Sequence, residues 1–384
     1  MLCGGLHAET VLVLPFFNHS KSSNLDWIGE SISEAVHDSL TSESLLALDR
    51  EDRLEIYRRL SLRVGAELTH ASIIKVGQTV DASNVIYGTY EVLPADSGKE
   101  QSKGSLRITA HVLNLKLLRQ SPEFSEVGAL EDLATLEAQL SWQALQLLNA
   151  HPRLSEQEFV RARPTVRLDA AESYVRGLLA PTPEQKHRFF TQAARLDEHY
   201  SQPCFQLGKD AWANKDYKVA ADWLMRVSAP DPQYREAQFL LGLCRFASGD
   251  FAGAEKAFQL VAAAVPLNEV FNNLGAAQAR RNDTAAAITN FRKALDGDSS
   301  DPDYHFNLGY TLWKMGKFTE AAASLRAAIT RNANDGEATA LLDRALKQIG
   351  PRPGESRFEG RERIKSNYEE TAYRQLQAEM AAKH

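Results

Sequence analysis

Two short polar segments hold the residue types that could bind a metal ion or a phosphate group. The first, DGDSSDPD at residues 296–303, contains several carboxylates, as a calcium-binding loop does. It lacks the alternating ligand spacing and the distal glutamate that such a loop needs. Asp301 followed by Pro302 is instead a helix-start signal, so we expect a helix to begin here and no metal to bind.

The second polar segment, SGKEQSKG at residues 97–104, has the glycine and lysine residues of a phosphate-binding loop without their spacing. We expect an exposed hairpin tip there. The chain also contains no G-x-G-x-x-G motif after a strand, no H-E-x-x-H and no G-x-S-x-G. The sequence therefore predicts a protein that is not an enzyme, with no catalytic residues and no cofactor.

The cysteines and histidines do not form a metal site either. Cys3, Cys204 and Cys244 are far apart and make no C-x-x-C pair, which argues against a zinc site, a redox dithiol and a disulfide framework. The ten histidines are dispersed, and His305 is expected to pack or to line a helix face.

Composition and charge exclude two further classes. The chain has 384 residues, of which 43% are hydrophobic and 24% are charged, which is typical of a globular protein with two or three domains. Its 44 Lys and Arg residues face 50 Asp and Glu residues, so there is no bulk positive field to attract a nucleic acid. No apolar run approaches the roughly 18 to 20 residues that cross a bilayer.

The first eight residues, MLCGGLHA, resemble the end of a secretion signal with cleavage after Ala8. An ordinary N-terminus is the alternative, and Cys3 before Gly4 lacks the preceding residues of a lipid-attachment motif. A signal would predict a periplasmic or other extracytoplasmic location. If the chain is complete as written, a cytoplasmic location is expected.

Alternating strands and helices indicate a small α/β domain with a mixed sheet at residues 9–150. The expected strands are residues 10–18, 45–49, 84–93, 105–115 and 123–128, and the expected helices are residues 26–43, 51–62, 69–83 and 131–150. Residues 151–168 have two prolines, several charges and no clear periodicity, so we interpret them as a linker.

A repeat with a period of about 34 residues begins after the linker. The glycines that mark it each follow a leucine, and they are Gly208, Gly242, Gly275 and Gly309. An alanine stands twelve residues after each glycine, and a large apolar residue stands sixteen after it. This periodicity predicts paired helices over residues 169–349, in which small residues let two helices approach closely.

Residues 201–336 resemble four tetratricopeptide repeats (TPRs), with the family's motifs in FNNLG at 271–275 and FNLGYTLWKMGKF at 306–318. A degenerate first repeat is expected at 170–200 and a capping helix at 337–349. The resemblance implies an all-α, right-handed superhelix. Residues 10–118 resemble the TolB-like amino-terminal domain that bacteria join to such arrays, a resemblance that brings no catalytic residues.

Residues 350–384 are predicted to form a loop and a final amphipathic helix over 361–384. Its apolar stripe contains Ile364, Tyr368, Ala372, Leu376 and Met380. The stripe must cover something apolar. Two alternatives are open: it docks on the end or the groove of the array, or it is presented to another protein.

The TPR resemblance also implies a concave groove lined by the first helix of each repeat. The residues expected to bind a partner there are Phe205, Lys209, Trp212, Phe239, Leu243, Phe246, Asn272, Arg280, Phe306, Tyr310, Trp313 and Lys314. Aromatic residues with Arg and Lys carry much of the energy of protein recognition. An extended peptide or a helix with apolar anchors and an acidic group would suit this surface.

We therefore expect a non-enzymatic scaffold that binds a protein or peptide partner, with no nucleic acid. One alternative is a small-ligand sensor or enzyme with its site in the N-terminal domain, around Pro15, Asn18 and Tyr90. Another is a component of envelope assembly, if the gene begins upstream with a signal. The sequence does not indicate the partner's identity or the oligomeric state.

Overall fold

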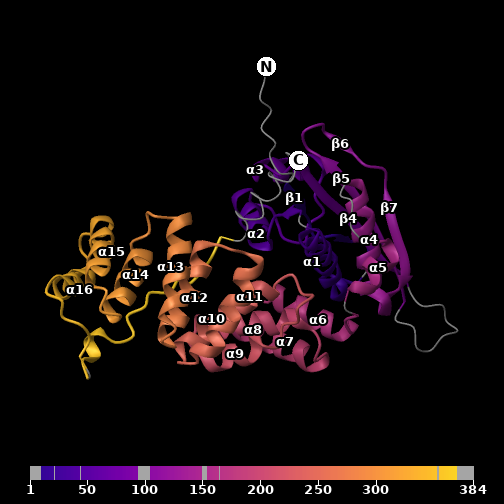
Figure 1. The fold of residues 1–384 in the computed structure, drawn as a ribbon. Coiled ribbons are helices and arrows are strands. Elements are labelled where there is room, and N and C mark those ends of the chain that lie inside the picture. The colour runs from indigo at the N-terminus through magenta and orange to yellow at the C-terminus, as the bar shows by residue number, and fades with distance from the viewer. Residues whose placement is uncertain are drawn as a thin grey trace, which may run out of the picture. The chain divides into compact units, whose positions relative to one another are not determined.

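The computed structural model describes residues 10–20, 22–43, 45–93, 104–148, 154–163, 165–352 and 354–369. The chain divides into two compact units, with the boundary between Cys204 and Phe205 (Figure 1). The expectations for residues 1–8 and for most of the hairpin tip lie outside the described residues.

The first unit contains a mixed sheet. Its strands are β1 (Thr10–Val13), β2 (Phe17–Asn18), β3 (Leu46–Ala47), β4 (Asn84–Leu93), β5 (Ser105–Asn114), β6 (Arg119–Gln120) and β7 (Phe124–Ala129). The order is β3-β1-β4-β5-β6, with β2 paired to β4 and β7 paired to β5. Pairs among β1, β2, β3 and β4 are parallel, whereas β5 is antiparallel to β4, β6 and β7.

Successive side chains of a strand point to opposite faces of the sheet, so helices can pack against the apolar side chains of a face. The helices are α1 (Trp27–Ser42), α2 (Arg50–Arg59), α3 (His70–Thr79) and α4 (Leu133–Leu147), with short 3₁₀ turns at Ser23–Leu25 and Leu130–Asp132. Leu12 and Val85 on the strands share one buried cluster with Ile56 of α2 and Val76 of α3. Helix α4 packs against α1 and against β7.

The range predicted to be a linker contains another helix, α5 (Glu156–Ala162). The Ser155 side chain and the Glu158 side chain cap its first turn reciprocally. Phe159 is fully buried, and its ring lies 5.3 Å from that of Trp142. A helix of two turns is too short to show a periodic pattern, which is why the sequence did not indicate it.

A helical hairpin follows, formed by α6 (Leu168–Leu179) and α7 (Pro183–Leu196). It lies where a degenerate first repeat was predicted, and a Cβ atom added at Gly177 would lie 2.5 Å from the Phe190 ring. That this hairpin is a repeat of the array stays a prediction. This hairpin belongs to the first unit, where α6 packs against α1.

The second unit is a run of helical hairpins. Its helices are α8 (Ser201–Ala213), which crosses the boundary, α9 (Tyr217–Leu224), α10 (Tyr234–Ala247), α11 (Phe251–Ala264), α12 (Asn268–Arg280), α13 (Thr284–Gly297), α14 (Pro302–Lys314), α15 (Phe318–Arg331) and α16 (Gly336–Leu346). The periodic glycines allow close helix contact: a Cβ at Gly242 would lie 2.6 Å from Phe258, and one at Gly275 would lie 2.8 Å from Phe291. The predicted fold class, a small mixed α/β region followed by an all-α repeat array, is confirmed.

The predicted C-terminal helix is wrong over residues 361–369, which form neither helix nor strand. The physical reason is tertiary: main-chain N–H groups that a helix would use internally are bonded to asparagine side chains of the array. Residues 370–384 lie outside the described part of the chain. No helix among the described residues is both long and apolar enough to span a bilayer.

Candidate functional site: a segment docked on the repeat helices

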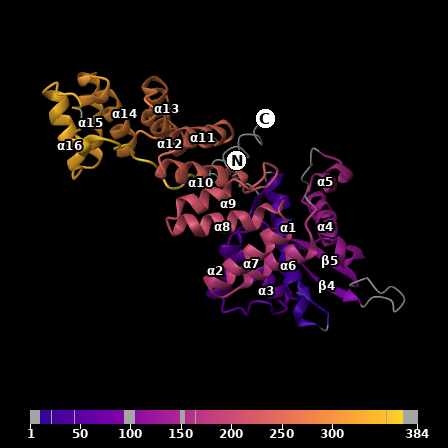
Figure 2. The same ribbon diagram turned by 90° about the horizontal axis from the view of Figure 1, so that it is seen from below.

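The chain after α16 turns back and runs along the repeat helices of its own unit. We call residues 354–369 the C-terminal segment, and we call the residues of α10, α12 and α14 that contact it, with the acidic residues beside them, the docking face. Both views show the segment passing α14 and α12 (Figures 1 and 2). Apart from a 3₁₀ turn at Ser356–Phe358, it has no helix or strand.

Three fully buried asparagines hold the main chain of this segment. Asn307 donates to the carbonyl of Arg363 at 2.7 Å and accepts from its N–H at 2.8 Å. Asn273 makes the same pair of bonds to Lys365, at 2.8 and 2.7 Å. Asn272 adds a bond to the Arg363 carbonyl at 2.8 Å, and its own carbonyl oxygen accepts from Asn307. Because the bonded residues are two apart, the segment is held in extended form.

An aromatic contact anchors the start of the segment. The Phe358 ring lies 5.8 Å from the Trp313 ring, and its carbonyl accepts from the Tyr310 hydroxyl at 2.6 Å. Trp313 donates its indole N–H to Ile349 at 2.8 Å. Burial, with the nearby Glu362 charge, raises the pKa of Tyr310 to about 12, so the phenol stays protonated as a donor.

Glu362 enters a cationic pocket. Its side chain is fully buried, with Lys314 Nζ 3.5 Å and Arg280 Nη1 3.8 Å from its oxygens. Neither carboxylate oxygen has a hydrogen-bond partner among the described residues. The pocket therefore holds the acid by charge at a short distance, without direct hydrogen bonds.

The two basic residues that follow pair with Asp301, Asp303 and Asp335, which we call the acidic wall. Arg363 donates to both oxygens of Asp335, at 2.7 and 2.9 Å, and its guanidinium stacks 3.5 Å above the centre of the Phe306 ring. Lys365 Nζ lies 2.7 Å from carboxylate oxygens of both Asp301 and Asp303. Burial lowers the pKa of each base, but the carboxylates more than offset this, so both pKa values are raised and both groups stay charged.

The structure brings only part of the predicted partner-binding set to the segment. The predicted residues that contact it or the preceding Ile349 are Phe239, Asn272, Arg280, Phe306, Tyr310, Trp313 and Lys314. The others lie along the helices without a recorded contact to the described part of the segment, and they are Phe205, Lys209, Trp212, Leu243 and Phe246. Among these, Lys209 pairs with Glu236 at 3.3 Å, and Phe205 and Leu243 are buried.

The prediction included Asn272 but missed the other two asparagines that bind the main chain and the carboxylates that bind the bases. Asn273 and Asn307 stand two positions before the repeat glycines, inside the N-L-G motifs that the sequence already displayed. Asp301 and Asp303 belong to the acidic segment considered above as a calcium loop. No group of three or more His, Cys, Asp or Glu residues in the described ranges is arranged to hold a metal ion.

At the alternative site in the N-terminal domain, the polar side chains make hydrogen bonds within the unit. Asn18 donates to Asp26 at 2.7 Å and to the Ser22 carbonyl at 3.0 Å. Tyr90 is buried and donates to the Leu25 carbonyl at 2.7 Å. Both residues thus fix the chain around the start of α1.

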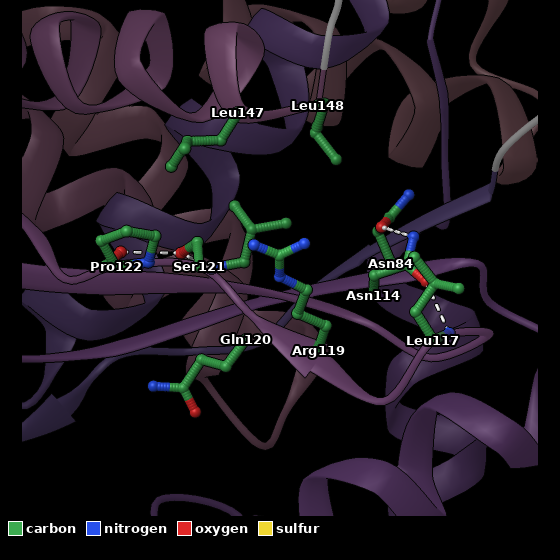
Figure 3. A pocket seen from close by; sticks show the side chains of 10 residues that line it. Asn84, Asn114, Leu117, Arg119, Gln120, Ser121, Pro122, Leu147 and Leu148 are labelled. Atoms are coloured by element: carbon green, nitrogen blue, oxygen red, sulfur yellow. Dashed lines mark hydrogen bonds between the residues drawn. The ribbon is translucent and has the colours of Figure 1, made fainter.

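A depression of about 280 Å³ lies elsewhere in this unit, where Leu147 and Leu148 at the end of α4 face Arg119 of β6, while the Gln120 side chain points away from them (Figure 3). Asn114 donates to Asn84 at its edge, at 3.1 Å. Its lining has one cation, three amides and one hydroxyl but no carboxylate, histidine or cysteine, so it offers no acid and base pair.

Buried ionisable groups in the first unit join helices. Glu30 of α1 pairs with Arg53 and with Arg50 of α2, the latter at 2.6 Å. Glu137 of α4 is fully buried and accepts from the Ser31 hydroxyl of α1 at 2.7 Å. Burial raises the pKa of Glu137 to about 8. These groups connect α1 to α2 and α4 within the core.

Comparisons with known proteins agree with the repeat periodicity. Models of the tetratricopeptide repeat match residues 205–269 and 302–335, and a TPR repeat model matches residues 275–316. No curated protein matches the chain significantly in sequence. The resemblance of residues 10–118 to a TolB-like domain stays a prediction.

Solved structures similar to the chain include TPR proteins. MamA 41-end from Desulfovibrio magneticus RS-1 is 21% identical with a TM-score of 0.38, and the match covers 44% of this chain and 95% of that one. YrrB, titled a TPR protein with an unusual peptide-binding site, is 15% identical with a TM-score of 0.36, covering 50% and 97%. The TPR2B domain of yeast Sti1, in its pHsp70 complex, is 23% identical with a TM-score of 0.29, covering 30% and 97%.

The family models and the helical hairpins together identify the second unit. Residues 205–335 contain tetratricopeptide repeats, and the chain is an N-terminal mixed sheet region followed by an all-α TPR superhelix.

Proposed function

We propose that the chain is a non-enzymatic scaffold whose TPR helices bind an extended segment of a polypeptide partner, with the docking face as the concave groove. The observation that carries this proposal is the set of buried asparagines, Asn272, Asn273 and Asn307, bonded to the main chain of an extended segment.

A buried side-chain amide is costly unless its N–H and carbonyl groups are hydrogen-bonded. Asn273 and Asn307 each present a donor and an acceptor side by side, the complement of one residue's C=O and N–H. This arrangement recognises any extended main chain, as an edge strand does. It therefore favours a polypeptide ligand over a small metabolite.

The surroundings of the asparagines supply the remaining binding energy. Phe306, Tyr310 and Trp313 form a row of rings along α14, with centroids 6.1 and 6.0 Å apart between neighbours. Cations and carboxylates of the docking face pair with the same segment. Rigid rings flanked by charges are the usual anchors of protein recognition.

Peptide selection tests this function. A random peptide library is displayed and selected against the full chain and against the full chain with Arg363→Glu, which places a like charge beside Asp335. We expect extended peptides to be selected, and Asn307→Ala to weaken their binding about tenfold through loss of two main-chain bonds.

The matched control is Asn290→Ala. Asn290 is also a buried asparagine, but it donates to Gln278 between α12 and α13 and has no recorded contact with the segment. The proposal is wrong if neither form of the chain selects peptides, or if the selected peptides bind the Asn307 and Asn290 variants equally well.

A further inference from the structure

The C-terminal segment matches the docking face charge by charge as well as through its main chain. Its acidic residue, Glu362, enters the pocket formed by Arg280 and Lys314. Its basic residues, Arg363 and Lys365, meet carboxylates. Opposite placement of any one of these charges would bring like charges together, so the face distinguishes sequences as well as binding main chain.

Alternation along the extended segment explains how neighbouring residues reach opposite charges. Residues 363 and 365 project to the acidic wall, while residues 362 and 364 project to the interior, where Ile364 packs against the apolar cluster of α14 and α15. The asparagine bonds fix which residues take which direction. A shift by one residue would place the bases in the cationic pocket.

We propose that Phe358, Glu362, Arg363 and Lys365 mark the recognition pattern of the partner, and that the chain's own segment competes with it. In that pattern an aromatic residue precedes a carboxylate by four positions, an arginine follows the carboxylate directly, and a lysine or arginine stands two positions further on. This inference rests on the proposed function and names its ligand class.

Each position in the pattern has a specific reason. Arginine is required next to the acid because its planar fork bonds both oxygens of Asp335 while stacking on Phe306, which a lysine does not do. The following basic position needs only a point charge between Asp301 and Asp303. The aromatic position packs on Trp313.

The chain's own segment is an imperfect ligand, because the Glu362 oxygens receive no hydrogen bond from the part of the chain that the structure describes. A partner whose carboxylate reaches Lys314 or Arg280 directly gains a charge-assisted bond that Glu362 lacks. The tether compensates, since a linked segment competes at an effective concentration on the order of millimolar. A free peptide should therefore bind the intact chain weakly and bind a chain with a weakened segment more tightly.

The experiment uses a fluorescent peptide of residues 355–369 and measures its anisotropy with full-length chains. In the released chain, Arg363→Glu and Lys365→Glu place negative charges beside the acidic wall. We expect the released chain to bind the peptide at least about tenfold more tightly than the intact chain. A chain released instead by Glu362→Gln alone provides a milder variant if the double substitution affects folding.

A charge exchange tests the pattern itself. In a chain released by Glu362→Gln alone, whose own segment keeps Lys365, Asp303→Lys should weaken the native peptide about tenfold and restore binding of a peptide with Lys365→Glu. Glu320→Lys is the matched control, because Glu320 is an exposed acid on α15 whose recorded pairs are with Arg292 and Lys317. A scrambled peptide of the same composition should bind at least about tenfold more weakly.

Several outcomes would overturn the inference. Equal binding of the scrambled peptide rejects the pattern, and equal affinity of intact and released chains rejects the competition, while display-selected peptides would still support the proposed function. Failure of both the segment peptide and the selected peptides rejects the two together. Light scattering that finds an intact dimer and a released monomer would assign the segment to a second copy and reject an external partner.

Discussion

Buried ion pairs occur in both units, but they connect different kinds of structure. In the first unit, Glu30 and Arg53 have side chains only 5% and 4% exposed, and both lie on helices packed into the core. On the docking face, Arg363 and Lys365 are each 22% exposed and lie on a segment without helix or strand beyond its first turn. Both cases pair a carboxylate with a basic side chain. In the first unit both partners lie on helices, whereas on the docking face the basic partner lies on a segment without regular structure.

This difference separates a structural ion pair from a binding one. Glu30 has no way to reach water if Arg53 is lost, because helices α1 and α2 hold it in place. In the proposed exchange, the C-terminal segment instead leaves the docking face as a piece, after which its bases and the acidic wall are both hydrated. The first arrangement stabilises a fold, and the second is suited to exchange with a ligand.

The largest effect is expected from Arg53→Ala, which removes the Arg53–Glu30 ion pair of the first unit. This change leaves Glu30 buried with Arg50 as its remaining partner, and it removes bonds to Ser33 and to the Val13 carbonyl. We expect it to lower the free energy of unfolding of the first unit by about 3 to 5 kcal/mol. Urea unfolding followed by circular dichroism measures this value.

The control for that change is Arg58→Ala on the same helix. Arg58 pairs with Glu55 at 2.9 Å, but its side chain is 75% exposed. Its loss should alter stability by less than about 0.5 kcal/mol. Similar losses for the two variants would contradict a structural role for the buried pair.

The next largest effect should come from Glu137→Gln, which is expected to stabilise the first unit. The pKa of Glu137 is raised from 4.5 to about 8 by burial, so its contribution is fully present below pH 4.5 and is lost as pH rises through about 8. At pH 7, which lies about 2.5 pH units above 4.5 and still below the raised value, the neutral amide should add about 3 kcal/mol, since each pKa unit corresponds to about 1.4 kcal/mol.

The measurement is the unfolding free energy of the wild type and the Gln variant at pH 5 and pH 8. Glutamine retains an oxygen to accept from Ser31, so the hydrogen bond persists. The gain should be larger at pH 8 than at pH 5. A gain that does not depend on pH would show that Glu137 is not the group whose ionisation opposes folding.

Arg363→Lys tests the ion pair between the C-terminal segment and the docking face. Lysine keeps the charge but loses the two parallel bonds to Asp335, so we expect segment docking to weaken by about 1 kcal/mol with no change in unfolding of the first unit. Trypsin cleavage after residue 365, followed by mass spectrometry, should become several-fold faster. Arg357→Lys, at an exposed position of the same segment, should have no such effect.

The repeat array was predictable because its sequence signal has a steric cause. The contact between each glycine and a large residue of the paired helix leaves no space for a Cβ atom, as at Gly242 against Phe258 and Gly309 against Leu325. That requirement recurs in every copy, so the period is visible in one sequence. The sheet was predictable for a similar reason, because strands β4 and β5 alternate through a long antiparallel pairing.

The state of the C-terminal segment was not predictable from local pattern. Ile364 and Tyr368 are spaced as on a helix, but the energy that fixes this segment comes from Asn273 and Asn307, roughly 90 and 55 residues away in sequence. The acidic wall is assembled from two helix starts, with Asp301 before α14 and Asp335 before α16. No single stretch of sequence contains that arrangement.

The smallest expected effect is the acid response of the docking face, and its direction is opposite to that of Glu137. Burial raises the pKa of Asp335, but the hydrogen bonds from Arg363 and from the Ala338 N–H outweigh it, so the pKa lies below 3.8. The contribution of Asp335 is therefore present above pH 3.8 and is lost as pH falls through its docked pKa.

Docking should weaken by at most about 1 kcal/mol between pH 5 and pH 3. Ionisation of Glu137 does not oppose folding in that pH range. Amide hydrogen exchange at residues 363 and 365, corrected for the intrinsic pH dependence of exchange, measures the change. Asp335→Asn keeps the cap of α16 and removes the titrating group, so it should flatten the response. An unchanged acid response in that variant would assign the effect to other carboxylates of the wall, and an exchange rate insensitive to acid would show that docking does not depend on the Arg363 ion pair.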